Sequence, residues 1–196
     1  MLEAIENKIR NCRRCELHNT RDFSVIGSGN KDSKIMFIGE SPSEEDDKYG
    51  MPFLDESGTM FDELLRHIGL ERTNVYMTNI VKCYQPKYIK KAEEKKAKAV
   101  NICSYWLDAE IYTINPDIIV TFGNFATSYI FEKFGLRDKI KGIGIIKGRV
   151  FKSRGIYIIP LYHPAFITHV PSKLNECKRD FEVLLASGNF EKICEE

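Results

Sequence analysis

Four cysteines stand at positions where their thiolates could hold a metal. Cys12 and Cys15 form a C-x-x-C pair in an arginine-rich stretch, whereas Cys83 and Cys103 occur singly much later in the chain. Thiolates from separate segments can close around a zinc ion or an iron–sulfur cluster, and spacing alone does not choose between them. The alternative is that all four are unrelated buried thiols.

A carboxylate, an aromatic ring, an amide and an imidazole form a second set of candidates. Glu40 lies in a turn of small residues, Phe53 in a Gly/Pro loop, Asn79 after an apolar run and His163 directly before a proline. Each has an ordinary structural explanation: a solvated turn, a core plug, a turn cap or a structural histidine. Together they could form a polar pocket that stacks on a heterocycle and forms hydrogen bonds to its edge.

Short apolar runs precede three of these four residues. Continuous apolar runs rich in β-branched and aromatic residues predict strands buried on both faces, at 34–39, 75–79, 117–122 and 156–160. Helical patterns are expected between and after them, at 58–68, about 92–114, 124–134 and 175–185. Alternation of the two predicts an α/β fold with a parallel sheet, whose ligands bind beyond the carboxyl ends of the strands. Glu40, Asn79 and His163 would meet at that edge.

The composition is that of an ordinary globular protein. We expect 196 residues, 43% of them hydrophobic, to form a single domain spanning 1–196. A net charge of +1 indicates no global field for a polyanion, so any nucleic-acid surface must be local. We find no signal peptide and no apolar run that could cross a bilayer, and we expect a cytoplasmic monomer without a membrane partner. In that compartment cysteines stay reduced, and we interpret the two outside the set, Cys177 and Cys194, as structural.

Short motifs connect the two sets of candidates. In chain order they are Cys12/Cys15, Thr20-Arg21, Gly27-Ser28-Gly29-Asn30, Gly39-Glu40-Ser41-Pro42-Ser43, Gly50-Met51-Pro52-Phe53, Thr78-Asn79-Ile80-Val81-Lys82-Cys83, Cys103 and Tyr162-His163-Pro164-Ala165. With these motifs the chain resembles the family 4 uracil-DNA glycosylases over nearly its whole length. The resemblance implies a three-layer α/β/α sandwich on a central four-stranded parallel sheet.

The resemblance also implies a cofactor and an activity. The cofactor is a structural [4Fe–4S] cluster held by Cys12, Cys15, Cys83 and Cys103. The activity is hydrolysis of the N-glycosidic bond of uracil in DNA, after the nucleotide has been flipped out of the duplex.

Roles for individual residues follow from this resemblance. We expect the catalytic residues to be Glu40, positioning water or offsetting the sugar cation, and His163, donating a hydrogen bond to uracil O2. The uracil-binding residues would be Gly39, Ser41, Phe53, Asn79 and His163, with Phe53 stacking on the base and the Asn79 amide pairing with N3–H and O4. The DNA-binding residues would be Lys82 and Lys87 on phosphates, with Lys90 and Lys91 as further candidates, and Ala165, Phe166 and Ile167 as a wedge.

Two departures from the family keep alternatives open. Ser41 and Ser43 stand where the family usually has Ala and Gly, and a hydroxyl there could alter the catalytic water or the bases accepted. These serines leave open a glycosylase for hypoxanthine or xanthine. A non-catalytic iron–sulfur protein that binds DNA is a separate alternative. The lysine-rich segment 84–91 also differs from the family pattern.

Overall fold

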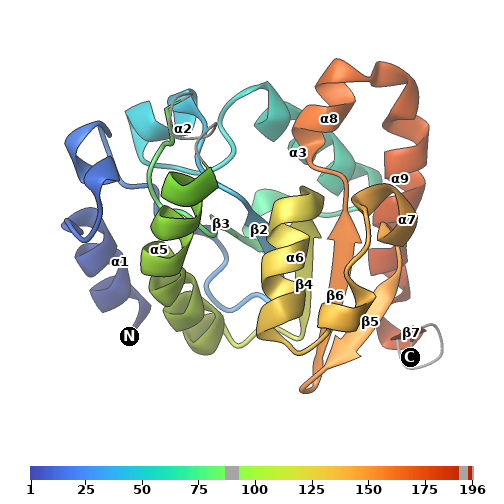
Figure 1. The fold of residues 1–196 in the computed structure, drawn as a ribbon. Helices are drawn as coiled ribbons and strands as arrows, with labels where there is room; N and C mark the ends of the chain where they lie inside the picture. The colour runs from blue at the N-terminus through green and yellow to red at the C-terminus, as the bar shows by residue number, and fades with distance from the viewer. Residues whose placement is uncertain (87–92, 190–193, 196) are drawn as a thin grey trace.

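The centre of the molecule is a mixed sheet whose four middle strands run parallel. The computed structural model describes residues 1–86, 93–189 and 194–195. The strands follow the order β1-β3-β2-β4-β6-β5-β7 (Figure 1). The parallel core consists of β3 (Tyr76–Asn79), β2 (Ile35–Gly39), β4 (Ile118–Phe122) and β6 (Ile156–Leu161). These are the four predicted strands, so the predicted core is confirmed.

Three further strands extend the sheet beyond the predicted four. The two-residue strand β1 (Ser28–Gly29) pairs antiparallel with β3, and β7 (Cys194–Glu195) pairs with β5. Strand β5 (Val150–Ser153) forms an antiparallel hairpin with β6. Its two-residue turn, Arg154-Gly155, has φ values of +50° and +82°, the left-handed conformation that two-residue hairpin loops require.

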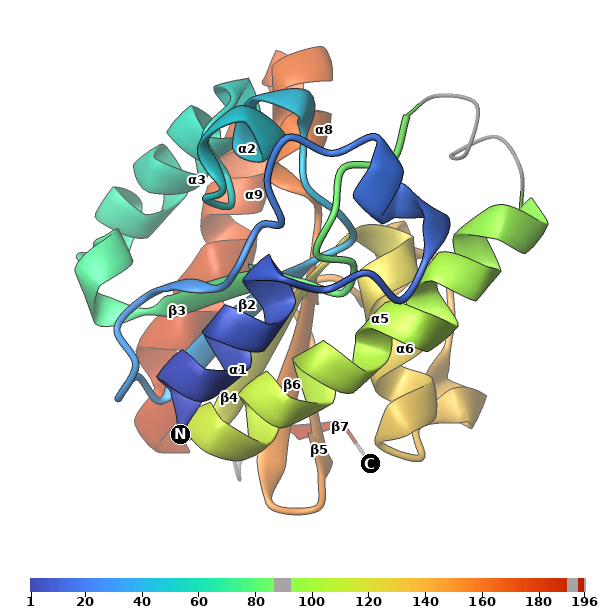
Figure 2. The ribbon, with the colours of Figure 1, turned by 90° about the vertical axis from the view of Figure 1, so that its left-hand side faces the viewer.

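Helices cover both faces of the sheet and make a three-layer sandwich (Figures 1 and 2). One face carries α1 (Leu2–Arg10), α5 (Glu93–Ile114), α6 (Gly123–Lys133) and α7 (Ile143–Ile146), with α1 lying along α5. The other face carries α3 (Glu56–His67) and α9 (Leu174–Glu182). Two short helices, α2 (Glu44–Tyr49) and α8 (Pro164–His169), follow β2 and β6 at the end where these strands stop.

Each face of the sheet has its own apolar core, because alternate strand residues point to opposite sides. In β2, Met36 and Ile38 pack with the side of α1, α5 and α6, whereas Phe37 packs with the side of α3 and α9. The predicted 175–185 helix corresponds to α9 followed by a 3-10 turn, η5 (Val183–Asn189); Phe181 and Leu184 are buried, and Leu185 is 63% exposed. No helix of the described residues is long and apolar enough to cross a membrane.

Candidate active site and cysteine cavity

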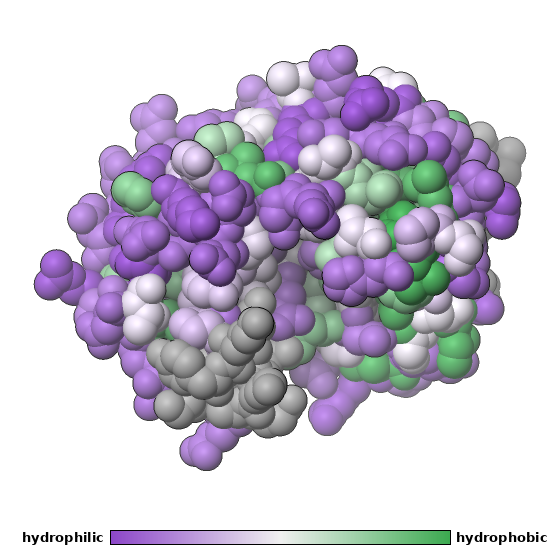
Figure 3. All heavy atoms as spheres, turned by 90° about the horizontal axis from the view of Figure 1, so that it is seen from above, coloured by the Kyte–Doolittle hydropathy of each residue, from purple (hydrophilic) through white to green (hydrophobic). Residues whose placement is uncertain are grey.

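The predicted pocket residues lie together at the carboxyl end of the sheet. They surround a cavity of about 370 Å³ on a predominantly hydrophilic face of the molecule (Figure 3). The residues lining it are Glu40, Ser41, Pro42, Ser43, Asp46, Phe53, Asp55, Ser57, Asn79, His163 and Ala165. Segments far apart in the sequence thus supply a carboxylate, a ring, an amide and an imidazole to one cavity.

Strand register fixes the relation between Glu40 and Asn79. Gly39 pairs with Asn79 at the ends of β2 and β3, and the ladder continues beyond them. The N–H of Ile80 donates to the Gly39 carbonyl at 3.0 Å, and that of Val81 donates to the Glu40 carbonyl at 3.0 Å. The backbone on both sides of the cavity floor is therefore held by the sheet.

Glycine at position 39 leaves room for the pocket side chains. A Cβ there would clash with Oδ1 of Asn79 and would come within 3.1 Å of Cζ of Phe53. Asn79 and Phe53 are both buried, at 3% exposure each. The amide and the ring can therefore approach the backbone of β2 only because residue 39 lacks a side chain.

The Phe53 backbone adopts the left-handed conformation. A φ of +58° is uncommon for a bulky residue, and it persists only where the surrounding structure imposes it. The ring packs with Phe61 at a centroid distance of 5.4 Å, with Phe122 at 5.9 Å and with His163 at 6.3 Å. Aromatic neighbours thus fix the ring at the cavity wall.

The imidazole of His163 is oriented by the helix that follows it. His163 is the N-cap of α8, and the backbone N–H of Ala165 donates to its Nδ1 at 3.1 Å. Because Nδ1 accepts this hydrogen bond, the neutral ring carries its proton on Nε2. The side chain therefore offers a donor without carrying a charge.

Ser43 lines the cavity and also stabilises the N-terminus of α2. It caps α2 in a capping box with Asp46: its Oγ accepts from the Asp46 N–H at 3.1 Å, and its own N–H donates to Asp46 Oδ2 at 3.0 Å. The other oxygen, Oδ1, accepts from the Leu54 N–H at 2.7 Å and so connects α2 to the Phe53 loop. The hydroxyl of Ser43 is engaged in this cap.

Lys82 does not face solvent, so the prediction that it contacts phosphate is wrong. Its side chain is 1% exposed, and Nζ lies 2.5 Å from Oε2 of Glu110, which is 0% exposed. The same ammonium donates to the Asn79 carbonyl at 2.7 Å and to Thr78 Oγ1 at 2.5 Å. A buried ammonium needs such partners, and here they include the backbone of Asn79.

Glu110 is a residue that the sequence analysis missed. It accepts hydrogen bonds from Thr78 Oγ1 at 2.9 Å, from the Tyr76 hydroxyl at 3.3 Å and from the Gly27 N–H at 3.3 Å. Burial, together with the negative charge of Glu110, raises the pKa of Tyr76 and keeps its hydroxyl protonated as a donor. No motif marks Glu110 in the sequence, because its partners lie 28 to 83 positions away.

The predicted DNA contacts give a mixed result. Ala165 lines the cavity, and Phe166 stacks on Tyr162 with ring centroids 4.4 Å apart. Ile167 is 1% exposed and packs in the core, so it does not form part of a wedge. Lys87, Lys90 and Lys91 lie outside the described residues.

The four motif cysteines line a second, narrow cavity. Cys12 and Cys15 come from the loop after α1, Cys83 follows β3 and Cys103 lies on α5. Burial raises the pKa of the Cys83 thiol and raises that of Cys103 to about 12. Among the described residues, no group of three or more His, Cys, Asp or Glu side chains is arranged to hold a metal ion.

Two of these sulfurs accept hydrogen bonds. Arg21 Nη1 donates to Cys83 Sγ at 3.0 Å, and the backbone N–H of Lys82 donates to Cys103 Sγ at 3.2 Å. The Arg21 guanidinium also donates to the Cys12 carbonyl at 2.8 Å and to the Arg10 carbonyl at 3.3 Å. Arg21 thus joins the first cysteine loop to the segment that carries Cys83.

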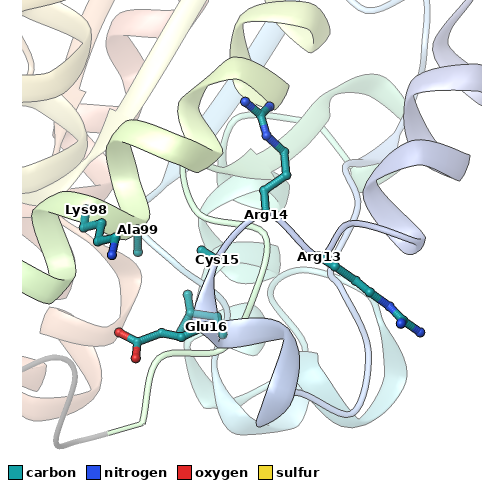
Figure 4. A pocket seen from close by; sticks show the side chains of 7 residues that line it. Arg13, Arg14, Cys15, Glu16, Lys98 and Ala99 are labelled. Carbon is teal, nitrogen blue, oxygen red and sulfur yellow. The ribbon is translucent and has the colours of Figure 1, made fainter.

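A cavity of about 290 Å³ opens beside the cysteines, between their loop and α5 (Figure 4). Arg13, Arg14, Lys98 and Glu16 are among the residues that line it, and Figure 4 shows the Arg13 side chain pointing away from Lys98 and Ala99. The Arg14 guanidinium lies 5.1 Å from the centroid of the Tyr105 ring, which places this cation against an exposed aromatic side chain.

Comparison with known proteins defines the class to which this fold and site belong. A family model for the uracil DNA glycosylase superfamily matches residues 26–185, and the chain belongs to that superfamily. A type-4 uracil-DNA glycosylase of Archaeoglobus fulgidus is 35% identical over 185 residues, which cover 92% of this chain and 90% of that protein. The type-4 enzyme of Thermotoga maritima is 35% identical over 180 residues, covering 91% and 88%.

A more distant relative helps to place the chain within the superfamily. A type-5 uracil-DNA glycosylase of Pyrobaculum aerophilum is 25% identical over 190 residues, covering 81% of this chain and 80% of that protein. Since type-4 proteins match more closely and more completely, the chain belongs to the type-4 uracil-DNA glycosylase family.

Proposed function

We propose that this protein removes uracil from DNA by hydrolysing the N-glycosidic bond and leaves an abasic site. One observation carries the proposal: Phe53, Asn79 and His163 line the same cavity. Its volume of about 370 Å³ falls within the ~300–1,000 Å³ range of small-molecule pockets. A duplex base cannot reach such a pocket unless its nucleotide is flipped out, at a cost of a few kcal/mol.

Phe53 and Asn79 would recognise the flipped base. The Phe53 ring offers a flat apolar face, and the Asn79 amide offers a donor and an acceptor that match O4 and N3–H of uracil. Cytosine presents the reverse pattern, so this pairing contributes roughly 1–3 kcal/mol of discrimination, by analogy with other bidentate base contacts. The hydrogen bond from Lys82 to the backbone carbonyl of Asn79 supports the proposal, because it holds the main chain from which this amide projects.

His163 and Glu40 would act on the departing base and the sugar. Bond cleavage places negative charge on uracil and positive charge on the deoxyribose. Nε2–H of His163 would donate to O2 as that charge develops, and a fixed neutral donor is well suited to this task. Glu40, on the same cavity, would position water or offset the sugar cation.

We propose a [4Fe–4S] cluster bound by Cys12, Cys15, Cys83 and Cys103. The donor set fits: four sulfurs line one cavity, and two of them accept N–H hydrogen bonds, as the thiolates of such clusters commonly do. The cluster would cross-link the loop after α1, the segment after β3 and helix α5. The chain itself contributes the N–H donors that offset the negative charge of the thiolates.

The direct test is a cleavage assay on oligonucleotides that each carry uracil, hypoxanthine, xanthine or thymine, with abasic sites as the readout. We expect cleavage at uracil, and we expect Asn79→Asp to lose uracil cleavage because its carboxylate cannot donate to O4. Asn101→Asp, an exposed position on α5, is the matched control and should match the wild type. Undiminished cleavage by Asn79→Asp, or no cleavage at uracil by the wild type, would contradict the proposal.

A wider range of bases remains a second candidate function, and Ser41 is the observation that favours it. Ser41 lines the cavity, whereas the hydroxyl of Ser43 is engaged in capping α2. If the Ser41 hydroxyl accommodates a purine, Ser41→Ala should lower cleavage at hypoxanthine or xanthine more than at uracil. Equal effects on all bases would remove this candidate.

A further inference from the structure

One arginine donates hydrogen bonds to the loop that carries Phe53 and to the helix that follows it. Arg72 lies in the 3-10 turn η2 (Arg72–Asn74), which precedes β3. Its Nη2 donates to the Phe53 carbonyl at 2.6 Å and to the Gly58 carbonyl at 3.2 Å, and its Nη1 donates to the Pro52 carbonyl at 3.4 Å. Nε donates to Oδ1 of Asp62 at 2.5 Å, so a carboxylate on α3 orients the guanidinium.

The shortest of these hydrogen bonds to a carbonyl is made to Phe53, whose backbone has an unfavourable conformation. Phe53 has a φ of +58°, and a conformation of this kind persists only where the surroundings impose it. Tight packing adds to the restraint, because a Cβ at Gly58 would clash with the Phe53 carbonyl oxygen. The hydrogen bond from Arg72 is thus one of the contacts that hold the Phe53 peptide in this conformation.

We propose that Arg72 is a positioning residue for uracil excision, acting through Phe53. The inference rests on the proposed role of Phe53 as the surface on which the base stacks. A planar guanidinium can reach several carbonyls and a carboxylate at once, whereas the ammonium of lysine is a point donor on a flexible stem. Arg72 does not line the cavity, so it would act on the base only through Phe53.

A double-mutant cycle tests this inference on the full-length protein. Single-turnover cleavage rates and KM for a uracil oligonucleotide are measured for the wild type, Arg72→Ala, Phe53→Ala and the double variant. We expect Arg72→Ala to slow cleavage by roughly 10–100-fold, because misplacement of a substrate-positioning group by about 1 Å has effects of that size. In the Phe53→Ala background the same substitution should change the rate by only about twofold, because the two residues act as one unit.

Two further variants sharpen the test. Arg72→Lys should lose most of the rate, since one ammonium cannot replace the forked contacts. Arg66→Ala removes an exposed arginine on the neighbouring α3, next to Asp62 and Arg72, and should leave the rate unchanged. Circular dichroism at the assay temperature establishes that each variant is folded. If Arg72→Ala is unfolded, Asp62→Asn takes its place in the cycle, because it loosens the guanidinium without removing it.

The outcomes separate this inference from the proposed function. If Phe53→Ala cleaves as fast as the wild type, the stacking role of Phe53 is wrong. If Phe53→Ala is impaired but Arg72→Ala matches Arg66→Ala, Phe53 keeps its role and the Arg72 inference is overturned. An equal loss on removing Arg72 in both backgrounds indicates a general structural role and also overturns it.

Discussion

The polar cavity and the cysteine cavity are built in different ways. In the first, Glu40 and His163 follow the ends of β2 and β6 and Asn79 is the last residue of β3, so the register of the parallel sheet brings them together. In the second, the cysteines come from a loop, a strand end and a helix that share no common ladder. Strand register preorganises Glu40, Asn79 and His163 in the first cavity, and side-chain contacts position Phe53 beside them. The geometry of the second cavity depends on side-chain contacts such as that of Arg21 with Cys83.

The two cavities meet in one short segment. Asn79 and Cys83 are four residues apart, and Lys82 between them donates through its side chain to the Asn79 carbonyl and through its backbone to Cys103 Sγ. Glu110 holds Lys82 from α5, the helix that also carries Cys103. The buried Lys82–Glu110 pair is therefore the point at which a single change should affect both regions.

The largest expected effect is that of Glu110→Gln. Removing one partner of a buried ion pair leaves an uncompensated charge and costs about 3–5 kcal/mol. We expect a loss of this size in the free energy of unfolding, measured by chemical denaturation. Glu132→Gln, in an exposed pair with Arg137, is the control and should cost less than about 1 kcal/mol.

Equal stability of Glu110→Gln and Glu132→Gln would contradict the role given to the buried Lys82–Glu110 pair in supporting both cavities. The double variant Lys82→Met/Glu110→Leu separates the charge pairing of Lys82 from its hydrogen bonds, because replacing both charges by apolar groups avoids the unpaired ion. It should recover part of the stability lost in Glu110→Gln. A double variant less stable than Glu110→Gln would indicate that the hydrogen bonds of Lys82, rather than its charge pairing, stabilise the segment.

The next largest effect concerns the polar cavity alone. His163→Leu should lower the single-turnover cleavage rate by about 10²–10³-fold, or about 2.7–4 kcal/mol, as expected when one preorganised donor to a developing anion is lost. If the cysteines bind the proposed iron–sulfur cluster, its iron content and visible spectrum should not change, because His163 does not line the cysteine cavity. His67→Leu, at the C-terminal end of α3 and in contact with Glu182 of α9, is the matched control. Full activity of His163→Leu, or loss of iron from it, would contradict the separation of the two regions.

Sequence patterns were sufficient to locate the polar cavity but not the contacts that support it. The four central strands were predictable because strands buried on both faces are continuous apolar runs, and their ends then determine where Glu40, Asn79 and His163 lie. The β5–β6 hairpin was missed, although its Arg154-Gly155 turn is the local signal that could have revealed it.

The errors concern side chains whose partners are distant in the sequence. Lys82 was expected to contact phosphate, but it is buried, and Glu110, 28 positions away in the sequence, compensates its charge. Arg72 was not considered, since its contacts with Pro52, Phe53 and Gly58 follow from the fold and not from a motif. Burial of such groups is a property of tertiary packing that no local pattern contains.

A smaller effect is expected at the cysteine cavity from Arg21→Met. The substitution removes the N–H donor to Cys83 Sγ, and hydrogen bonds to charged groups contribute about 1.5–3 kcal/mol. If the cysteines bind an iron–sulfur cluster, its visible absorption should decay at least about 10-fold faster under a chelator, while the initial cleavage rate is unchanged. Arg13→Met is the control, because Arg13 is exposed and lies near the same loop. Equal decay in both variants would show that Arg21 does not stabilise the thiolate.

The smallest effect separates the two serines that depart from the family pattern. Ser43→Ala removes the N-cap of α2 and should cost about 1 kcal/mol of unfolding free energy, within the usual range of 0.5–2 kcal/mol for such caps. The ratio of cleavage at uracil to cleavage at hypoxanthine should not change, because the Ser43 hydroxyl is engaged by the Asp46 N–H. A changed ratio in Ser43→Ala would mean that the capping serine also contacts the base from its place in the lining of the polar cavity.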